Sequence, residues 1–137
     1  MKTYKFILKG EVPSKKNSKR LTKYWRLIPS EKFYSWHNGA MIELLKQERP
    51  KNALDGILII KFTFIHGTLQ RRDSDNQITS ILDLLKDVKI IEDDNWIIVR
   101  KIEVNNYFEK GNSQSIIEIS DITAEANKWQ MQSQSYQ

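Results

Sequence analysis

The chain has 137 residues, no cysteine and a formal net charge of +5. This length suits one domain, which would bury roughly 68% of the surface that the unfolded chain exposes. The absence of cysteine excludes disulfides, zinc–thiolate sites and thiol nucleophiles. No apolar run approaches the roughly 20 residues that a membrane span needs, and the lysine-containing amino terminus does not read as a signal peptide. We therefore expect a cytoplasmic protein with no membrane partner.

Positive charge is concentrated in the first quarter of the chain. Residues 1–32 contain ten lysines and arginines but two glutamates, a net charge of +8, so the remainder sums to about −3. A basic segment on a mildly acidic body predicts an arm that binds a polyanion.

The first half of the chain predicts a strand, a loop and a helix. Alternating apolar residues indicate a strand over 2–10, and residues 11–29 hold two of the three prolines and predict a loop. Ser30 is expected to cap a helix that runs to about Glu48. The buried stripe of this helix is expected to consist of Phe33, Trp36, Ala40, Met41, Leu44 and Leu45.

The second half predicts three strands and a second helix. Residues 56–66 read as a central strand because they are β-rich and apolar on both faces near their start. A helix is expected from about Asn76 to Lys86. Residues 97–106 and 114–120 predict two strands joined by a turn in which Gly111 adopts a positive φ.

This order of elements predicts an α/β (α+β) fold, a single domain with a mixed β-sheet and two main helices packed on it. We assign residues 1–121 to this domain. Residues 122–137 are rich in glutamine and serine and are expected to form a polar tail, disordered or helical.

The segment RRDSDNQ, residues 71–77, raises two interpretations. Asp73 and Asp75 are two apart in what should be extended chain, so both side chains would point the same way. Asp94 follows the second helix, and we expect the loops at the two ends of that helix to meet at one edge of the sheet. In the alternative, purely structural interpretation, Ser74 caps the helix and Gln77 completes a capping box.

Electrostatics favour a cation if a third carboxylate joins the first two. Like charges 4 Å apart repel by about 4 kcal/mol at an effective dielectric constant of about 20. All-oxygen ligands suit Mg²⁺, with Mn²⁺ as the alternative. Such an ion activates water and stabilises a leaving alkoxide, which is the chemistry of phosphodiester hydrolysis. Arg71 and Arg72 would then bind the phosphate, unless they only pair with the aspartates.

The stretch RRDSDNQITSILDLLKDVKIIEDDNWI resembles the core motif of the RusA family of Holliday junction resolvases. That motif has an arginine-rich lead into Asp-x-Asp-Asn, a helix and then an Asp-Asp pair. The segment VPSKKNSKR, residues 12–20, resembles the family's Pro-x-x-Asn/Lys-Asn segment. The resemblance covers most of residues 1–104.

The resemblance implies that Asp73, Asp75 and Asp94 are Mg²⁺-binding catalytic carboxylates, supported from a second layer by Asn76 and Asp93. It also implies a homodimer, of bacterial or phage origin, that cuts four-way DNA junctions by paired symmetric nicks, as the two-fold symmetry of such a substrate requires.

One position departs from the family motif. The lysine expected four residues after the second aspartate is Thr79 in this chain. Lys86, Lys89 or a lysine of the partner subunit are the candidates to replace it.

The basic arm supplies the remaining candidate DNA contacts. Its cationic side chains would neutralise phosphates, while Tyr24 and Trp25 would stack on unpaired bases. The alternative is a solvated loop. His66 is a further candidate, as general base or phosphate contact, although a lone loop histidine usually has neither role. The DNA-binding residues assigned to the arm are Lys15, Lys16, Asn17, Lys19, Arg20, Lys23 and Arg26.

The sequence thus predicts a Mg²⁺-dependent, structure-selective endonuclease that resolves Holliday junctions in DNA recombination and repair. Two alternatives remain open. One is a non-catalytic protein that binds branched DNA, and the other is a metal-dependent nuclease that prefers flaps or RNA.

Overall fold

The structure, a computed structural model, describes residues 1–14, 19–21 and 27–126. Its elements are β1 (Lys2–Lys9), β2 (Lys19–Leu21), β3 (Leu27–Pro29), α1 (Glu31–Leu45), β4 (Leu58–His66), α2 (Ser74–Asp87), β5 (Val99–Phe108) and β6 (Gln114–Asp121). A helical turn follows at 123–126. The predicted tail beyond it, 127–137, lies outside the described residues.

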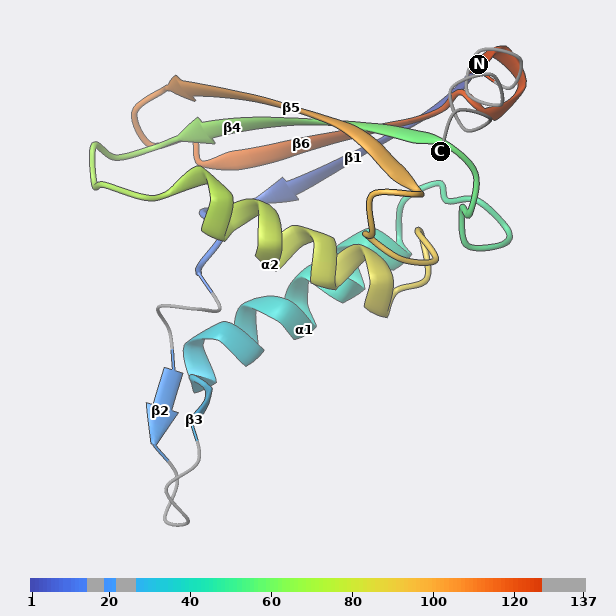
Figure 1. Cartoon of the computed structure of the whole chain (residues 1–137). Helices are drawn as coiled ribbons and strands as arrows, with labels where there is room; N and C mark the ends of the chain where they lie inside the picture. Colours follow the sequence, from blue (N-terminus) through green and yellow to red (C-terminus); the bar gives the residue numbers. More distant parts are fainter. Residues whose placement is uncertain (15–18, 22–26, 127–137) are drawn as a thin grey trace.

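A four-stranded mixed sheet forms the centre of the molecule, in the order β1-β6-β4-β5. Strand β5 is parallel to β4, whereas β6 is antiparallel to both β1 and β4. Figure 1 shows α1 and α2 together on one face of this sheet. The predicted fold, a mixed sheet with two helices packed on it, is confirmed. Among the described residues, no helix has the length and apolar character needed to cross a membrane.

The core lies between the sheet and the two helices. Along β4, every second side chain from Leu58 to Phe64 is buried, because alternate side chains of a strand face the same side. Helix α2 contributes fully buried Ile81, Leu84 and Leu85 from one face. The buried side chains thereby fix how α2 lies along β4, and so where its two ends fall.

Three local predictions need correction. The loop predicted over 11–29 contains two short strands, β2 and β3, which pair with each other. Helix α1 starts after the predicted Ser30 cap, whose Oγ accepts a hydrogen bond from Phe33 N–H, but it ends at Leu45 instead of near Glu48. Leu45, predicted to be buried, is exposed.

The predicted turn between the last two strands is confirmed at 109–112. Gly111 has a φ of +75°, as expected. The strands on either side of it are not neighbours, however, because β4 lies between β5 and β6 in the sheet. A turn glycine predicts a local change of direction, but it does not determine which strand pairs with which.

Candidate functional site

Asp73 and Asp75 lie at the amino-terminal end of α2. Asp73 is the residue before the helix, with an extended backbone, and its carbonyl accepts the Gln77 N–H at 3.2 Å. Asp75 is already helical, so the prediction of extended chain through both residues is wrong at Asp75. Residues two apart in a helix do not face each other. The two carboxylates therefore share one end of the helix but not one direction.

The capping-box alternative is wrong as well. Ser74 is the first helical residue and not the cap, and the side chain of Asp73 makes no capping hydrogen bond. Gln77 donates its Nε2 to Val12 O at 3.0 Å instead of reaching back along the helix. Both aspartates are exposed, and neither carboxylate has a hydrogen bond or ion pair to any residue that the structure describes. Their charges are available to a ligand.

The start of the predicted basic arm is attached to α2. Gln77 holds Val12, and Ser80 Oγ donates to Pro13 O at 2.7 Å. Both donor side chains are buried, with exposed fractions of 2% for Gln77 and 0% for Ser80. The chain therefore enters residues 15–26 from a point beside Asp73.

Most of the arm itself lies outside the described residues. This applies to Lys15, Lys16, Asn17, Lys23 and Arg26. Lys19 and Arg20 belong to β2, whose side chains are not described. Their DNA-binding roles remain predictions.

A polar pocket of about 320 Å³ lies where the 12–14 segment meets α2. Lys32, Arg71 and Arg72 line it together with Asp73 and Asn76. Gln77 also lines it, and its Oε1 is a buried acceptor with no hydrogen-bond partner in the described chain. Three cations face one carboxylate here, so the pocket favours an anion.

A second pocket of about 420 Å³ lies on the other side of the two arginines, between the ends of β4 and β5. His66, at the end of β4, contacts residues on both sides of it. His66 Nδ1 lies 2.5 Å from Glu11 Oε1, and His66 Nε2 lies 2.8 Å from Asn106 Oδ1 in β5. Asn106 in turn donates its Nδ2 to Ser74 Oγ at 3.1 Å, and Arg72 Nε lies 3.6 Å from Glu11 Oε2. This network fixes the start of α2 against β4 and β5.

The contacts of His66 favour the protonated ring. Both of its ring nitrogens face acceptor oxygens, and a histidine donates from both nitrogens only when it is protonated. Burial alone would lower the pKa of His66, but the hydrogen bond to Asn106 and the carboxylate of Glu11 outweigh it and raise the pKa above its usual value. In the protonated form, which these contacts favour, His66 has no lone pair for a general base and adds a positive charge to the pocket.

Asp93 and Asp94 lie at the other end of α2. Lys86 Nζ is 3.2 Å from Asp94 Oδ1, and Asp93 accepts hydrogen bonds from Asn95 Nδ2 and from the backbone N–H of Asp94. The hydrogen bond from Asn95, followed by that from the Asp94 backbone, lowers the pKa of Asp93. Burial alone would lower the pKa of Lys86. The contacts of Lys86 with Asp94 and Asp83 outweigh burial and raise this pKa, so the side chain stays charged.

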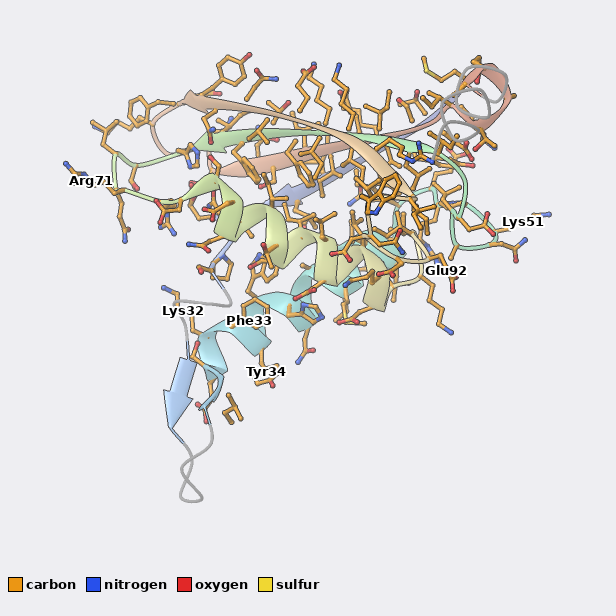
Figure 2. All side chains as sticks on the ribbon, in the orientation of Figure 1. Lys32, Phe33, Tyr34, Lys51, Arg71 and Glu92 are labelled. Atoms are coloured by element: carbon orange, nitrogen blue, oxygen red, sulfur yellow. The ribbon has the colours of Figure 1, made fainter. Side chains whose placement is uncertain are left out.

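Within one chain, the structure does not bring the three predicted metal ligands together. Helix α2 has 14 residues and is therefore about 21 Å long. Figure 2 shows Arg71 and Glu92, which flank the two acidic loops, at opposite ends of the molecule. No group of three acidic or histidine side chains in the described part of the chain is placed to hold one ion. The expectation that both loops meet at one edge of the sheet is wrong for a single chain.

The lysines considered as replacements for Thr79 also lie far from Asp73. Thr79 donates its Oγ1 to Asp75 O within the helix and brings no charge. Lys86 accompanies Asp94, and Lys89 follows α2 with a φ of 60°. Neither lysine lies at the Asp73 end of its own chain.

Comparison with known proteins does not assign the chain to a family. No protein-family model matches the sequence, and no curated protein matches it.

Three residues of the site, Glu11, Ser80 and Asn106, were missed in the sequence, and Gln77 was assigned a different role, in a capping box. Glu11 and Asn106 hold His66, while Gln77 and Ser80 hold the 12–14 segment. Gln77 and Ser80 are polar residues three apart on a helix with an apolar core face, which is a readable signal. No sequence signal identifies Glu11 and Asn106, because their partner, His66, is distant from both in sequence.

Proposed function

We propose that the protein is a Mg²⁺-dependent endonuclease of the RusA type that resolves four-way DNA junctions as a homodimer. The observation that carries this proposal is the attachment of the 12–14 segment to α2 by Gln77 and Ser80. It supports a shared location for the basic arm, the two arginines and Asp73, the combination that the RusA-like motifs imply. The arm and the catalytic carboxylate would then meet one DNA backbone.

DNA binding would rest on cations around the two pockets. Arg71 and Arg72 line both pockets, Lys32 lines one and His66 the other. A guanidinium binds phosphate through two parallel hydrogen bonds, and the start of α2 adds the positive end of a helix dipole. The two pockets would then each bind a phosphate of the DNA backbone.

The donors at the Asp73 end fit Mg²⁺ in type but fall short in charge. Carboxylate and amide oxygens are what Mg²⁺ prefers, and Asp73, Asn76 and Gln77 Oε1 supply them. One carboxylate among three cations does not attract a divalent ion, however. The DNA phosphate and further carboxylates must supply the missing charge.

A partner subunit is the source that fits. Asp94 is at the wrong end of its own α2, and a two-fold axis would exchange the two ends between protomers. Asp73 and Asp75 of one chain would then act with the partner's Asp94, and the partner's Lys86 would arrive with it. When bound there, Mg²⁺ would activate a water and stabilise the leaving oxygen.

Paired inactive variants test this arrangement. Asp75→Asn and Asp94→Asn homodimers should each fail to cut a labelled junction with Mg²⁺, and wild-type protein should fail with EDTA. A heterodimer of the two variants, isolated through two different tags, has one intact site if the ligands are shared between subunits. It should therefore nick one strand of the junction. A heterodimer without nicking activity would falsify the shared site.

A non-catalytic protein that binds branched DNA is the second candidate. The Lys86–Asp94 ion pair favours it, because the pair already neutralises the third carboxylate. Wild-type protein that binds the junction but does not cut it with Mg²⁺ or Mn²⁺ would support this candidate. Cleavage of flap or RNA substrates in preference to junctions would indicate a nuclease of a different specificity.

A further inference from the structure

The two edge strands of the sheet, β1 and β5, differ in whether their outward backbone groups have hydrogen-bond partners. At the β1 edge, Gln47, which follows the end of α1, accepts the Ile7 N–H at 2.9 Å and donates to Ile7 O at 2.7 Å. Glu43 accepts the Lys9 N–H at 3.3 Å. Helix α1 and Gln47 thus occupy the backbone groups of β1 that another strand would use. At the opposite edge, no strand of the described chain pairs with the outer side of β5.

The outer backbone groups of β5 can be identified from its bonds to β4. Glu109 N–H donates to His66 O at 3.0 Å, and the pairing of the two strands is regular from Lys101 onward, beyond a register shift after Leu58. Because backbone groups alternate along a strand, the odd-numbered residues from 103 to 109 face β4. The N–H and C=O groups of residues 102, 104, 106 and 108 therefore point outward, a template for a further strand.

Exposed apolar side chains gather along this edge. Of the eleven large hydrophobic residues that are exposed in the described chain, five belong to 96–108. Such a concentration marks a protein contact surface. The five are Trp96, Ile97, Ile102, Tyr107 and Phe108.

We propose that a second copy of this chain pairs with β5, antiparallel, with the two-fold axis at Ile102. Residues around Ile102 then face the partner residues at the same distance on its other side. Lys101 faces the partner's Glu103, and the same pair recurs by symmetry. Trp96 and Ile97 lie in the turn just before β5, so this orientation brings them toward the carboxyl end of the partner's β5, where Tyr107 and Phe108 are exposed.

Neighbouring registers lack this complementarity. With the axis at Glu103, that carboxylate would oppose its own copy, and like charges directly opposite in a sheet are destabilising. With the axis at Val104, Lys101 would face Tyr107 and Glu103 would face Asn105. The register centred on Ile102 pairs opposite charges and places the exposed Ile102 against its own copy.

This interface has a consequence for the carboxylates, which rests on the proposed nuclease function. Antiparallel pairing brings the residues before β5 of the partner to the carboxyl end of β5. At that end, Asn106 is hydrogen-bonded to Ser74, next to Asp73 and Asp75. The interface itself does not depend on catalysis.

Single cysteine variants test the register in a chain that has no cysteine of its own. In Ile102→Cys, the two Cα atoms would be about 5.5 Å apart, within the range of about 4.4–6.8 Å that a disulfide allows. Val104→Cys is the matched control, because the two copies of residue 104 would be offset by about 14 Å along the strands. We expect a disulfide-linked dimer with Ile102→Cys and none with Val104→Cys. A mixture of Lys101→Cys with Glu103→Cys should cross-link more completely than either variant alone.

Equal cross-linking of residues 102 and 104, or wild-type protein that sediments as a monomer, would overturn the proposed interface. Ile102→Lys provides a second test: it should convert the dimer to a monomer while the circular dichroism spectrum stays unchanged, and a dimer that persists contradicts the interface. These readouts are independent of DNA cleavage. A cross-linked dimer that cuts no junction would argue against the nuclease alone, whereas an active dimer that does not cross-link at 102 would argue against this interface alone.

Discussion

Lys86 and Asp94 form an ion pair at the carboxyl-terminal end of α2, with Lys86 Nζ 3.2 Å from Asp94 Oδ1. Lys86 also lies 3.6 Å from Asp83 Oδ1 on its own helix. Two carboxylates thus position one ammonium group. If the carboxylate of Asp94 belongs to a catalytic site, the ammonium group of Lys86 lies beside that site. If the proposed nuclease function holds, Lys86 can supply the ammonium group that the RusA-like motif would place at Thr79.

Replacement of Lys86 should impair cleavage more than binding. In Lys86→Gln, the ammonium group that would stabilise charge on the phosphate is lost, and we expect a loss of about a hundredfold in the single-turnover cleavage rate. Junction affinity, measured without a divalent ion, should change little. Lys89→Gln is the matched control, since Lys89 is exposed and forms no ion pair within the described chain. Equal effects of the two substitutions would remove Lys86 from the mechanism.

Arg71 should contribute to affinity through a phosphate. If Arg71 binds one, Arg71→Gln weakens junction binding and reduces the slope of log K against log salt concentration by about 1. Lys51→Gln removes the same charge at the other end of the molecule, where Figure 2 places Lys51. Fluorescence anisotropy over a range of salt concentrations gives both slopes. The same slope for both variants would mean that Arg71 acts through overall charge alone.

The fold was predictable to the extent that it depends on local patterns. Alternation identified β4, and Ser30 identified the start of α1, because each signal lies within a few residues. The insertion of β6 between β1 and β4 was not predictable. It depends on which long-range pairing buries most apolar surface, and the turn at Gly111 carries no information on that choice.

The site was predictable at one end of α2 only. Arg71, Arg72, Asp73 and Asn76 do share one pocket, because they are close in sequence and lie at the start of one helix. The position of Asp94 depends on the length of that helix. A helix of 14 residues separates its ends by about 21 Å. The seven residues that follow it, 88–94, could in extended form run back along that distance, but in the structure Asp94 stays beside Lys86 at the carboxyl-terminal end. The sequence did not determine which of these paths the chain takes.

Ser80 should contribute to stability through the 12–14 segment. Ser80→Ala leaves Pro13 O, a buried acceptor, without its donor, and we expect a loss of about 1–3 kcal/mol in the free energy of unfolding. Thr79→Ala is the matched control, since its hydroxyl donates only within the helix, and it should cost much less. Urea unfolding followed by tryptophan fluorescence measures both. Similar losses in the two variants would mean that the bond to Pro13 adds nothing.

The charge of His66 should make stability depend on pH. Its pKa is raised in the folded protein, so its stabilising effect is fully present below the unfolded value of about 6.5 and is lost as the pH rises through the folded pKa. Glu11→Gln removes the carboxylate that favours the charged ring, so the free energy of unfolding should fall less steeply with rising pH in this variant. The chain has two histidines, so NMR titration of the ring nitrogens resolves His66 once His37→Asn has assigned the other. A His66 that titrates at the same pH with and without Glu11 would show that the pair does not hold the proton.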